Sequence, residues 1–144
     1  MSTIREVLQR KGGTVLTTHR QTSVLDAIGT MSQANIGAIV IEQDGKPVGI
    51  FTERDYLRKI ALEGRSSRET SVEDVMSSPL ITVEPAEATQ SAMQTMTECR
   101  CRHLVVLDGG EMVGIVSLGD LVKHMLVLKE AEIEQLSSYI SGSY

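Results

Sequence analysis

The chain has 144 residues, 41% hydrophobic and 23% charged, which is enough for one domain or for two half-domains that share a core. Its net charge of −5 and its lack of Trp exclude a basic, aromatic surface for nucleic acid. Since neither a membrane-spanning apolar run nor a secretory signal is recognisable, we expect a cytoplasmic protein with neither nucleic acid nor membrane among its partners.

The first part of the chain predicts a helix followed by strand, helix, strand, strand and helix. Thr22 or Ser23 is a suitable N-cap for the second helix. The pair Asp44-Gly45, between two apolar runs, is a strong hairpin signal. In chain order, the predicted elements are a helix at 4–11, an extended piece at 15–17, a helix to about residue 34, strands at 37–41 and 48–51, and a helix from Thr52 toward Leu62.

The second part predicts the same order of elements. It follows a polar, turn-rich segment at 63–71 and a short helix at 72–76. The predicted hairpin turn is Gly109-Gly110. The other predicted elements are an extended piece at 80–82, a helix at 88–98, strands at 103–107 and 112–116, and a helix from Ser117.

An internal repeat explains why the two parts look alike. Residues 49–55 return 65 positions later as residues 114–120, and the register holds without a gap between residues 15–62 and 80–127. Each copy has too little apolar surface to be stable alone. We therefore expect two copies that pack sheet to sheet about a pseudo-twofold axis and form two equivalent clefts.

Each copy carries a hydroxyl and, three residues later, an aspartate: Thr52 and Asp55 in the first copy, Ser117 and Asp120 in the second. The hydroxyl suits a helix N-cap, and the carboxylate offers two acceptor oxygens, the number that a ribose cis-diol needs. N–H groups exposed at a helix start also favour an anion nearby. The same pattern is that of a capping box, which only satisfies the helix end. Both interpretations stay open.

A glycine stands three residues before each hydroxyl, Gly49 in the first copy and Gly114 in the second. We expect each glycine to end a turn. The lack of a side chain would let a ligand approach the backbone closely at that point.

The chain carries no recognisable catalytic motif. Cys99 and Cys101 have no matching Cys or His pair at zinc spacing and do not form Cys-x-x-Cys, so ordinary thiols in a reducing compartment are expected. Phosphate-loop, zinc-protease and serine-hydrolase motifs are missing from the sequence. We predict no enzyme, no catalytic residue, no metal site and no catalytic cofactor.

After His124 the apolar residues recur at helical spacing, which predicts a continued or second amphipathic helix. This tail either packs against a sister subunit or folds back on its own domain, and both arrangements stay open. The apolar residues concerned are Leu126, Ile133, Leu136 and Ile140.

On these motifs the sequence closely resembles a tandem pair of CBS (cystathionine-β-synthase-type) domains, the Bateman module, over roughly residues 4–128. Residues 52–56, 64–67 and 138–142 further resemble the small stand-alone two-CBS proteins of bacteria and plant organelles. The resemblance implies an α/β (α+β) fold of two β-α-β-β-α repeats. The implied organisation is a CBS domain at 4–63, a linker at 64–71, a CBS domain at 72–128 and a helical tail at 129–144.

The resemblance also implies a function. Modules of this family bind adenine nucleotides such as AMP, ATP or NAD, some members bind S-adenosylmethionine, and pairs commonly associate as flat dimers. We therefore expect a non-catalytic, homodimeric regulatory module that binds an adenine nucleotide in the clefts between repeats and relays occupancy to a regulated enzyme or transporter. One alternative is an interaction module with empty clefts that acts through its dimer surface. A catalyst or redox protein that uses the two cysteines is a third hypothesis.

The two clefts are expected to differ in charge. In similar modules the residue pair before the strand points at the phosphate, so Arg102 and His103 are phosphate candidates, whereas the matched Gly37 and Ala38 only leave room. The first cleft would need a phosphate contact from elsewhere, for which the candidates are Arg54, Arg58, Lys59 and Arg65. The alternatives are an ordinary strand histidine for His103 and a solvated surface charge for each of these four residues.

The adenine ring needs an apolar slot, whose walls would be aliphatic in a chain without Trp. Thr17 and Thr82 occupy equivalent positions before the helices and can hydrogen-bond the edge of the base. The alternative is that the slot residues are core residues. The slot candidates are Leu16, Ile39, Ile50, Ile81, Leu104 and Ile115.

Overall fold

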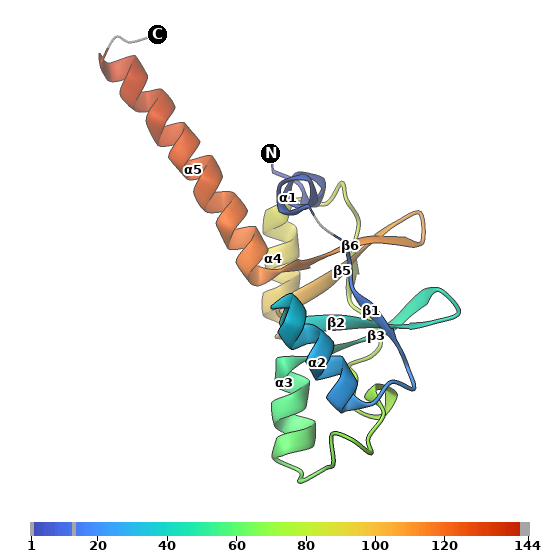
Figure 1. Cartoon of the computed structure of the whole chain (residues 1–144). Coiled ribbons are helices and arrows are strands. Elements are labelled where there is room, and N and C mark those ends of the chain that lie inside the picture. The colour runs from blue at the N-terminus through green and yellow to red at the C-terminus, as the bar shows by residue number, and fades with distance from the viewer. Residues whose placement is uncertain (1, 13, 142–144) are drawn as a thin grey trace. The chain divides into compact units, whose positions relative to one another are not determined.

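The structure is a computed structural model that describes residues 2–12 and 14–141, and its elements follow the predicted order (Figure 1). The pieces predicted at 15–17 and 80–82 form strands that begin two residues later, and the helix predicted at 72–76 is a single 3₁₀ turn. The elements are α1 (Ile4–Lys11), β1 (Thr17–His19), α2 (Val24–Ala34), β2 (Ala38–Gln43), β3 (Lys46–Thr52), α3 (Glu53–Asp55), the π-helical η1 (Tyr56–Ala61), η2 (Val72–Asp74), β4 (Thr82–Val83), α4 (Thr89–Cys99), β5 (His103–Asp108), β6 (Glu111–Ser117) and α5 (Leu118–Ser141).

The strands form two three-stranded sheets, β1-β2-β3 and β4-β5-β6, so that each copy of the repeat has the predicted order β-α-β-β-α. In the first sheet β1 pairs with β2 in parallel, because α2 carries the chain back between them, and β2 pairs with β3 as an antiparallel hairpin. The predicted mixed α/β fold class is confirmed.

Both hairpin turns use the left-handed backbone that the sequence predicted. Asp44 and Gly45 have φ of 53° and 77°, and Gly109 and Gly110 have φ of 61° and 86°. Two successive positive φ values match the turn to the right-handed twist of the flanking strands, which is why Asp-Gly and Gly-Gly stand there. Ser23, and not Thr22, caps α2: its side chain accepts the N–H of Asp26.

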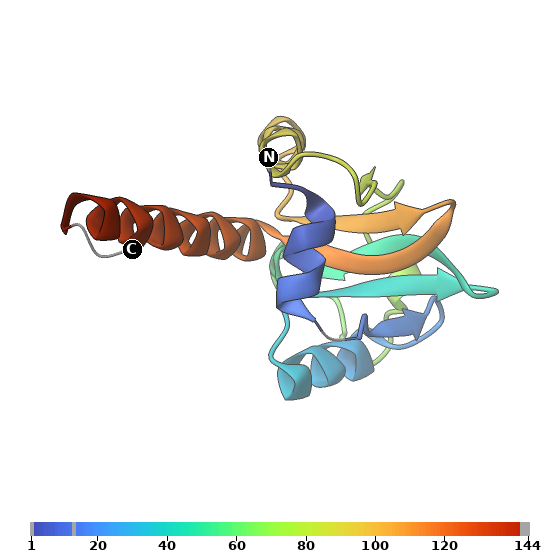
Figure 2. The same ribbon diagram turned by 90° about the horizontal axis from the view of Figure 1, so that it is seen from above.

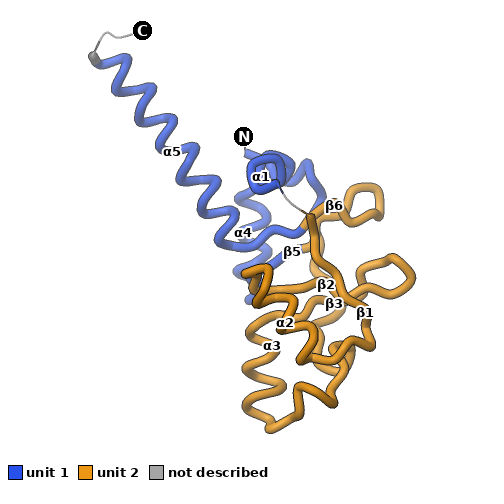
Figure 3. Tube along the Cα trace, in the orientation of Figure 1, with its two compact units in different colours: residues 1–12, 83–104, 115–144 blue, residues 13–82, 105–114 orange. Residues whose placement is uncertain are grey.

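The chain forms two compact units that interleave along the sequence (Figure 3). Unit 1 comprises Met1–Gly12, Val83–Leu104 and Ile115–Tyr144, and unit 2 comprises Gly13–Thr82 and Val105–Gly114. These units are defined by spatial compactness, so they do not test the predicted boundaries of the repeats in the sequence, which stay a prediction. Residues 142–144 of the predicted tail lie outside the described residues.

The core of unit 2 is built where the helices cover one face of the first sheet. Residues from α2, β2, β3, η1 and η2 are buried together, and Tyr56 and Met76 pack against them. Burial of this set removes several large aliphatic side chains from water, which stabilises the fold. The chain has one Phe and no Trp, so aliphatic side chains make up most of its core. The buried residues are Val24, Ala27, Met31, Ile39, Ile41, Phe51, Ile60, Val72 and Val75.

In unit 1, α1 packs against the first turns of α5. Ile4 and Val7 of α1 and Leu121 of α5 are buried, and α5 contacts both α1 and α4. After its first turns α5 continues away from these helices, as Figures 1 and 2 show. The prediction of a continued helix after His124 is therefore confirmed.

The expectation that Gly49 and Gly114 each end a turn was wrong, and Gly114 lies within β6. Gly49 lies within β3 and does not end a turn, and a Cβ atom built on it would overlap the side chain of Met76. The space beside this glycine thus belongs to the core of unit 2, and it is not an approach route for a ligand.

We expect Gly49→Ala to destabilise the protein by about 1–3 kcal/mol, because the added methyl group overpacks the core against Met76. The control is Gly29→Ala in α2, where nothing lies within 4 Å of the new Cβ. The control should be neutral or stabilising, since Ala is the better helix former. Urea denaturation of both variants measures the difference, and equal stabilities would refute this account of Gly49.

Candidate functional site

The first motif, in unit 2, is a complete capping box at the start of α3. The hydroxyl of Thr52 accepts the N–H of Asp55 at 3.1 Å, and Oδ2 of Asp55 accepts the N–H of Thr52 at 3.0 Å. The Thr52 hydroxyl also donates to this Oδ2 at 3.2 Å. The predicted hydroxyl and carboxylate are thus brought together as helix-capping partners.

The second oxygen of Asp55 is also engaged within unit 2. Oδ1 accepts the hydroxyl of Ser77 at 3.0 Å and lies 3.1 Å from Nζ of Lys59. Lys59 in turn donates to the carbonyl of Val75 at 2.9 Å. Through the bond to Ser77, this carboxylate links the start of α3 to the segment after η2. Its side chain is only 8% exposed.

The second motif, in unit 1, has the same cap and a different surrounding. The N–H of Ser117 donates to Oδ2 of Asp120 at 2.8 Å, and the N–H of Asp120 donates to the hydroxyl of Ser117 at 3.0 Å. Lys11, at the end of α1, places Nζ 2.7 Å from the same Oδ2 and 2.8 Å from the carbonyl of Ile115. The side chain of Asp120 is 24% exposed, three times as much as that of Asp55.

The surroundings of Asp120 act on its pKa in opposite directions. Partial burial raises the pKa, but the hydrogen bond from Lys11, the N–H of Ser117 and the charge of Lys11 together lower it below its ordinary value. Asp120 is therefore a carboxylate at neutral pH and can only accept hydrogen bonds there.

Each motif is also tied to the residue pair that precedes the neighbouring strand. The N–H of Glu53 donates to the carbonyl of Gly37 at 3.1 Å, and the N–H of Leu118 donates to the carbonyl of Arg102 at 2.8 Å. This contact brings the predicted pairs beside their helix starts, in the same register in both copies. It also occupies one of the N–H groups that an anion would need, which weakens the argument from a free helix start.

The remaining predicted residues differ in accessibility. Ile39 and Leu104 are buried core residues, as the alternative interpretation had it, whereas Ile50 and Ile115 are half-buried. Thr17 is half-buried and pairs with Val40. The other residues are placed as follows: Ala38 is buried and pairs with Thr52, Gly37 and His103 are half-buried, Arg54 and Arg102 are exposed, and Thr82 is exposed in β4.

Sequence reasoning missed Lys11 and Ser77, and it named Lys59 only as a possible phosphate contact and not as the partner of Asp55. Lys11 meets Asp120 across 109 positions, and Ser77 meets Asp55 across 22. A single sequence carries no signal for such long-range pairs. Lys59 was identifiable, because it stands four residues after Asp55 on one helix face.

The two cysteines lie in unit 1 as free thiols, Cys99 exposed and Cys101 half-buried. Burial raises the pKa of the Cys101 thiol, and the neighbouring Cys99 raises it further. Its nucleophilic thiolate form is therefore scarce at neutral pH. Among residues 2–12 and 14–141, no three His, Cys, Asp or Glu side chains lie together as a metal site would require.

Comparison with known proteins identifies the family. The CBS domain profile matches residues 4–62 and 72–127, which is most of the chain. A mitochondrial CBS domain-containing protein of Arabidopsis thaliana, CBSX3, is 41% identical over 99% of this chain and 74% of its own length. The chain belongs to the CBS-domain family.

Solved structures show the same fold. A candidate signal-transduction protein with CBS domains from Burkholderia ambifaria matches with a TM-score of 0.84 and 42% identity, over 88% of this chain and 95% of its own. The CBS domain pair of protein MJ0100, solved with 5′-methylthioadenosine and S-adenosyl-L-methionine, matches with a TM-score of 0.76 and 23% identity, over 87% and 96%. The chain therefore has the fold of a CBS-domain pair, a class of domain that is generally regulatory and not catalytic. Within the part of the chain that the structure describes, no helix is long and apolar enough to cross a membrane.

The lowered pKa of Asp120 predicts a pH-dependent stability. The folded-state pKa lies below the unfolded value of about 3.9, so this carboxylate stabilises the fold fully above that value and loses its contribution as the pH falls through the folded pKa. The wild type should therefore have a higher unfolding free energy than Asp120→Asn. This difference should be largest above about pH 5 and should shrink toward pH 2.

Urea denaturation at a series of pH values measures this difference. Lys11→Met is the control, since it removes the contact that lowers the pKa most. The unfolding free energy of Lys11→Met should vary less with pH in this acidic range than that of the wild type. A difference between wild type and Asp120→Asn that stays constant with pH contradicts the prediction.

Proposed function

We propose that the chain is a non-catalytic regulatory module that binds an adenine nucleotide at the Ser117–Asp120 motif. The observation that carries this proposal is the difference between the two motifs. Asp55 has both oxygens engaged in a nearly closed environment, whereas Asp120 is a partly exposed carboxylate whose nearest cation, Lys11, is itself 34% exposed. A ribose hydroxyl reaches an accessible carboxylate at far lower cost than a buried one.

The chemistry around the second motif suits a nucleotide. Asp120 would accept ribose hydroxyls, which is a stronger interaction than a neutral acceptor provides. Arg102, exposed and bound through its carbonyl to the start of α5, would supply the guanidinium for a phosphate, with His103 beside it. Lys11 adds a second positive charge within reach of the same ligand. The first motif lacks this charge in its matched pair, Gly37 and Ala38.

The class of ligand follows from this chemistry and from the family. The adenosine derivatives bound by the MJ0100 domain pair support an adenosine-type ligand here. AMP, ATP and NAD share the ribose diol and the phosphate, and S-adenosylmethionine shares only the ribose and the base. Because the proposed site offers positive charge, we rank the phosphate-bearing ligands first.

The proposed output is regulation of a partner protein, an enzyme or a transporter, by a homodimer of this chain. A ligand changes such a partner only when it binds one conformation of the module better than the other. Asp120 lies in the first turn of α5, so occupancy acts on the helix that carries the tail. The expected cytoplasmic location stays a prediction, and the Arabidopsis relative is mitochondrial.

A second candidate function is an interaction module without a ligand. It is favoured by one observation: both carboxylates already serve as helix caps within their own units. In that case Asp120 would matter for stability alone.

Isothermal titration with AMP, ATP, NAD and S-adenosylmethionine separates the two functions. We expect the wild type to bind at least one phosphate-bearing ligand, and Asp120→Asn to weaken that binding at least tenfold, about 1.4 kcal/mol. Its stability at neutral pH should fall by less than about 1 kcal/mol, since the Asp120–Lys11 pair is partly exposed.

The matched control is Asp55→Asn. It should lose about 1–3 kcal/mol of stability, because Ser77 and Lys59 lose a buried partner, and it should keep its nucleotide affinity within about threefold. Absence of heat with every ligand, or equal loss of affinity in both variants, would overturn the proposed site.

A further inference from the structure

The distal part of α5 carries a row of large apolar side chains exposed to solvent. We call this row the α5 strip: Val122, Leu126, Ile133, Leu136 and Ile140. Their exposed fractions are 41%, 58%, 62%, 57% and 83%. A row of exposed apolar side chains along one helix face, interrupted here at Lys129, marks an interaction site, whereas single exposed leucines need no explanation.

The spacing of the strip is that of a helix–helix seam. When Lys129 is counted between Leu126 and Ile133, successive positions of the strip are alternately four and three residues apart. This alternation is the a/d pattern of a coiled coil, with lysine at one of the apolar positions. At about 100° per residue all six side chains fall within roughly 80° of the helix circumference. The strip is therefore one narrow face, and the two other exposed apolar side chains of α5, Leu128 (41%) and Tyr139 (68%), lie about 100–120° away from its middle.

The opposite face of α5 is the one that packs on unit 1. His124, about 180° from Ile133 around the helix, is buried. Its Nδ1 accepts a hydrogen bond from Nε of Arg10 at 3.1 Å, and its Nε2 lies 3.7 Å from a carboxylate oxygen of Glu6. Since α1 already occupies that face, the packing of α5 on unit 1 leaves the α5 strip uncovered.

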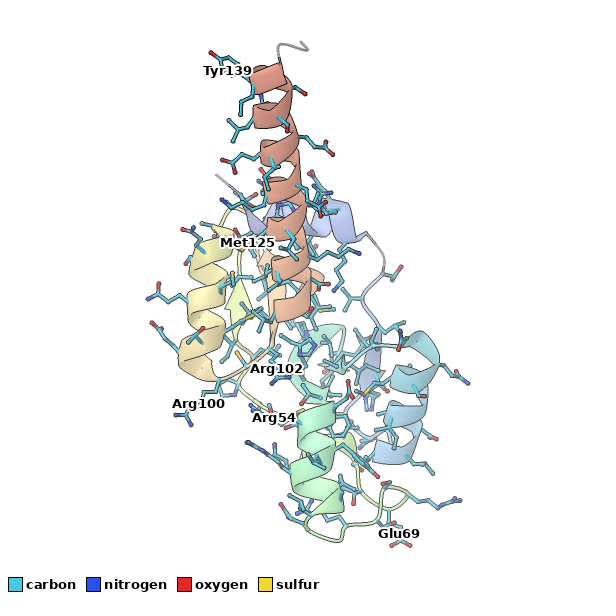
Figure 4. All side chains as sticks on the ribbon, turned by 90° about the vertical axis from the view of Figure 1, so that its left-hand side faces the viewer. Arg54, Glu69, Arg100, Arg102, Met125 and Tyr139 are labelled. Atoms are coloured by element: carbon cyan, nitrogen blue, oxygen red, sulfur yellow. The ribbon has the colours of Figure 1, made fainter. Side chains whose placement is uncertain are left out.

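The figures agree with this arrangement. In Figures 1 and 2 the last turns of α5 extend beyond α1 and α4 of the same unit. Figure 4 shows Tyr139 near the far end of α5, where no other element of unit 1 lies beside the helix. The strip therefore runs along a helix segment that unit 1 leaves open on this side.

We propose that the α5 strip pairs with the α5 strip of a second copy of this chain, in antiparallel orientation, over residues 122–140. In this register Leu126 faces Leu136 of the second copy, and Val122 faces Ile140 of the second copy. The overlap of 19 residues is about 28 Å long.

Charge determines the orientation. In a parallel, in-register pair, Lys129 would face Lys129 of the second copy inside an apolar seam, which is repulsive and poorly solvated. In the antiparallel pair Lys129 lies opposite Ile133 of the second copy, near Glu130 and Glu132 of that copy, and it keeps the ion pair with Glu132 of its own helix at 3.7 Å. The two lysines thereby offset the glutamates of both copies, which come close together at the centre of the seam. The positive position of one strip thus meets the acidic stretch of the other.

The same charges argue against a membrane surface as the occupant. Between Leu128 and Ser141 the helix has one lysine against three glutamates, whereas helices that lie on anionic membranes present Lys and Arg on their polar face. A second copy supplies both the apolar surface and the complementary charge.

Sedimentation velocity of the full chain over a range of concentrations tests the proposal. A single helix pair is at the small end of stable interfaces, so we expect a concentration-dependent dimer with a dissociation constant on the order of micromolar. The variant Ile133→Glu with Leu136→Glu should raise that constant at least thirtyfold. The control Ala131→Glu with Gln135→Glu adds the same charge on the far side of α5 and should change it less than threefold.

A wild type that is monomeric throughout, or a strip variant that dimerises as tightly as the control, overturns the proposal. The interface extends the proposed function and does not depend on it: nucleotide titrations of the strip variant report on the site, and sedimentation reports on the interface.

The orientation has its own test, in a background of Cys99→Ser and Cys101→Ser. Chains with Leu126→Cys mixed with chains with Leu136→Cys should form disulfide-linked dimers on mild oxidation, because these positions face each other only in the antiparallel pair. Chains with Ile133→Cys alone should crosslink poorly. Efficient crosslinking through Cys at position 133 and none between 126 and 136 would establish a parallel pair and contradict the proposal.

Discussion

The structure uses one contact twice, a carboxylate that pairs with a hydroxyl three residues earlier at a helix start. In both copies the aspartate accepts the N–H of its own N-cap residue, and the hydroxyl accepts the N–H of the aspartate. These bonds satisfy helix N–H groups that would otherwise lack partners, and they set the direction in which α3 and α5 leave their strands. Duplication has kept the cap in both copies and changed what surrounds it.

The surroundings decide what each aspartate can do. Ser77 and Lys59 close the environment of Asp55, and we therefore propose a structural role for it in unit 2. The side chain of Asp120 stays partly exposed, and so does that of its ion-pair partner Lys11. If a ligand binds at Asp120, it acts on the first turn of α5, and the proposed contact with a second copy lies further along the same helix. Site and interface would then be linked by one rigid element and not by a long chain of side-chain contacts.

Much of the fold could be predicted because its determinants are local. The cap by Ser23, the Asp44-Gly45 turn and the Thr52–Asp55 pairing each lie within a few residues, and the repeat carried every element of the first copy to the second. The pairing of Lys11 with Asp120 could not be predicted, because it spans 109 positions. The packing of Gly49 against Met76 could not be predicted for the same reason, whereas its place inside a strand followed already from the strand predicted at 48–51.

The central claim is that the two capping aspartates have diverged, one toward structure and one toward a ligand. The most direct measurement is an amide ¹H–¹⁵N NMR titration of the full chain with AMP. The account predicts saturable shifts of the Ser117 and Asp120 amides, whose hydrogen bonds the ligand would perturb, and much smaller shifts of the Thr52 and Asp55 amides. Shifts of Thr52 and Asp55 that equal or exceed those of Ser117 and Asp120, or no shift at either pair, would contradict it.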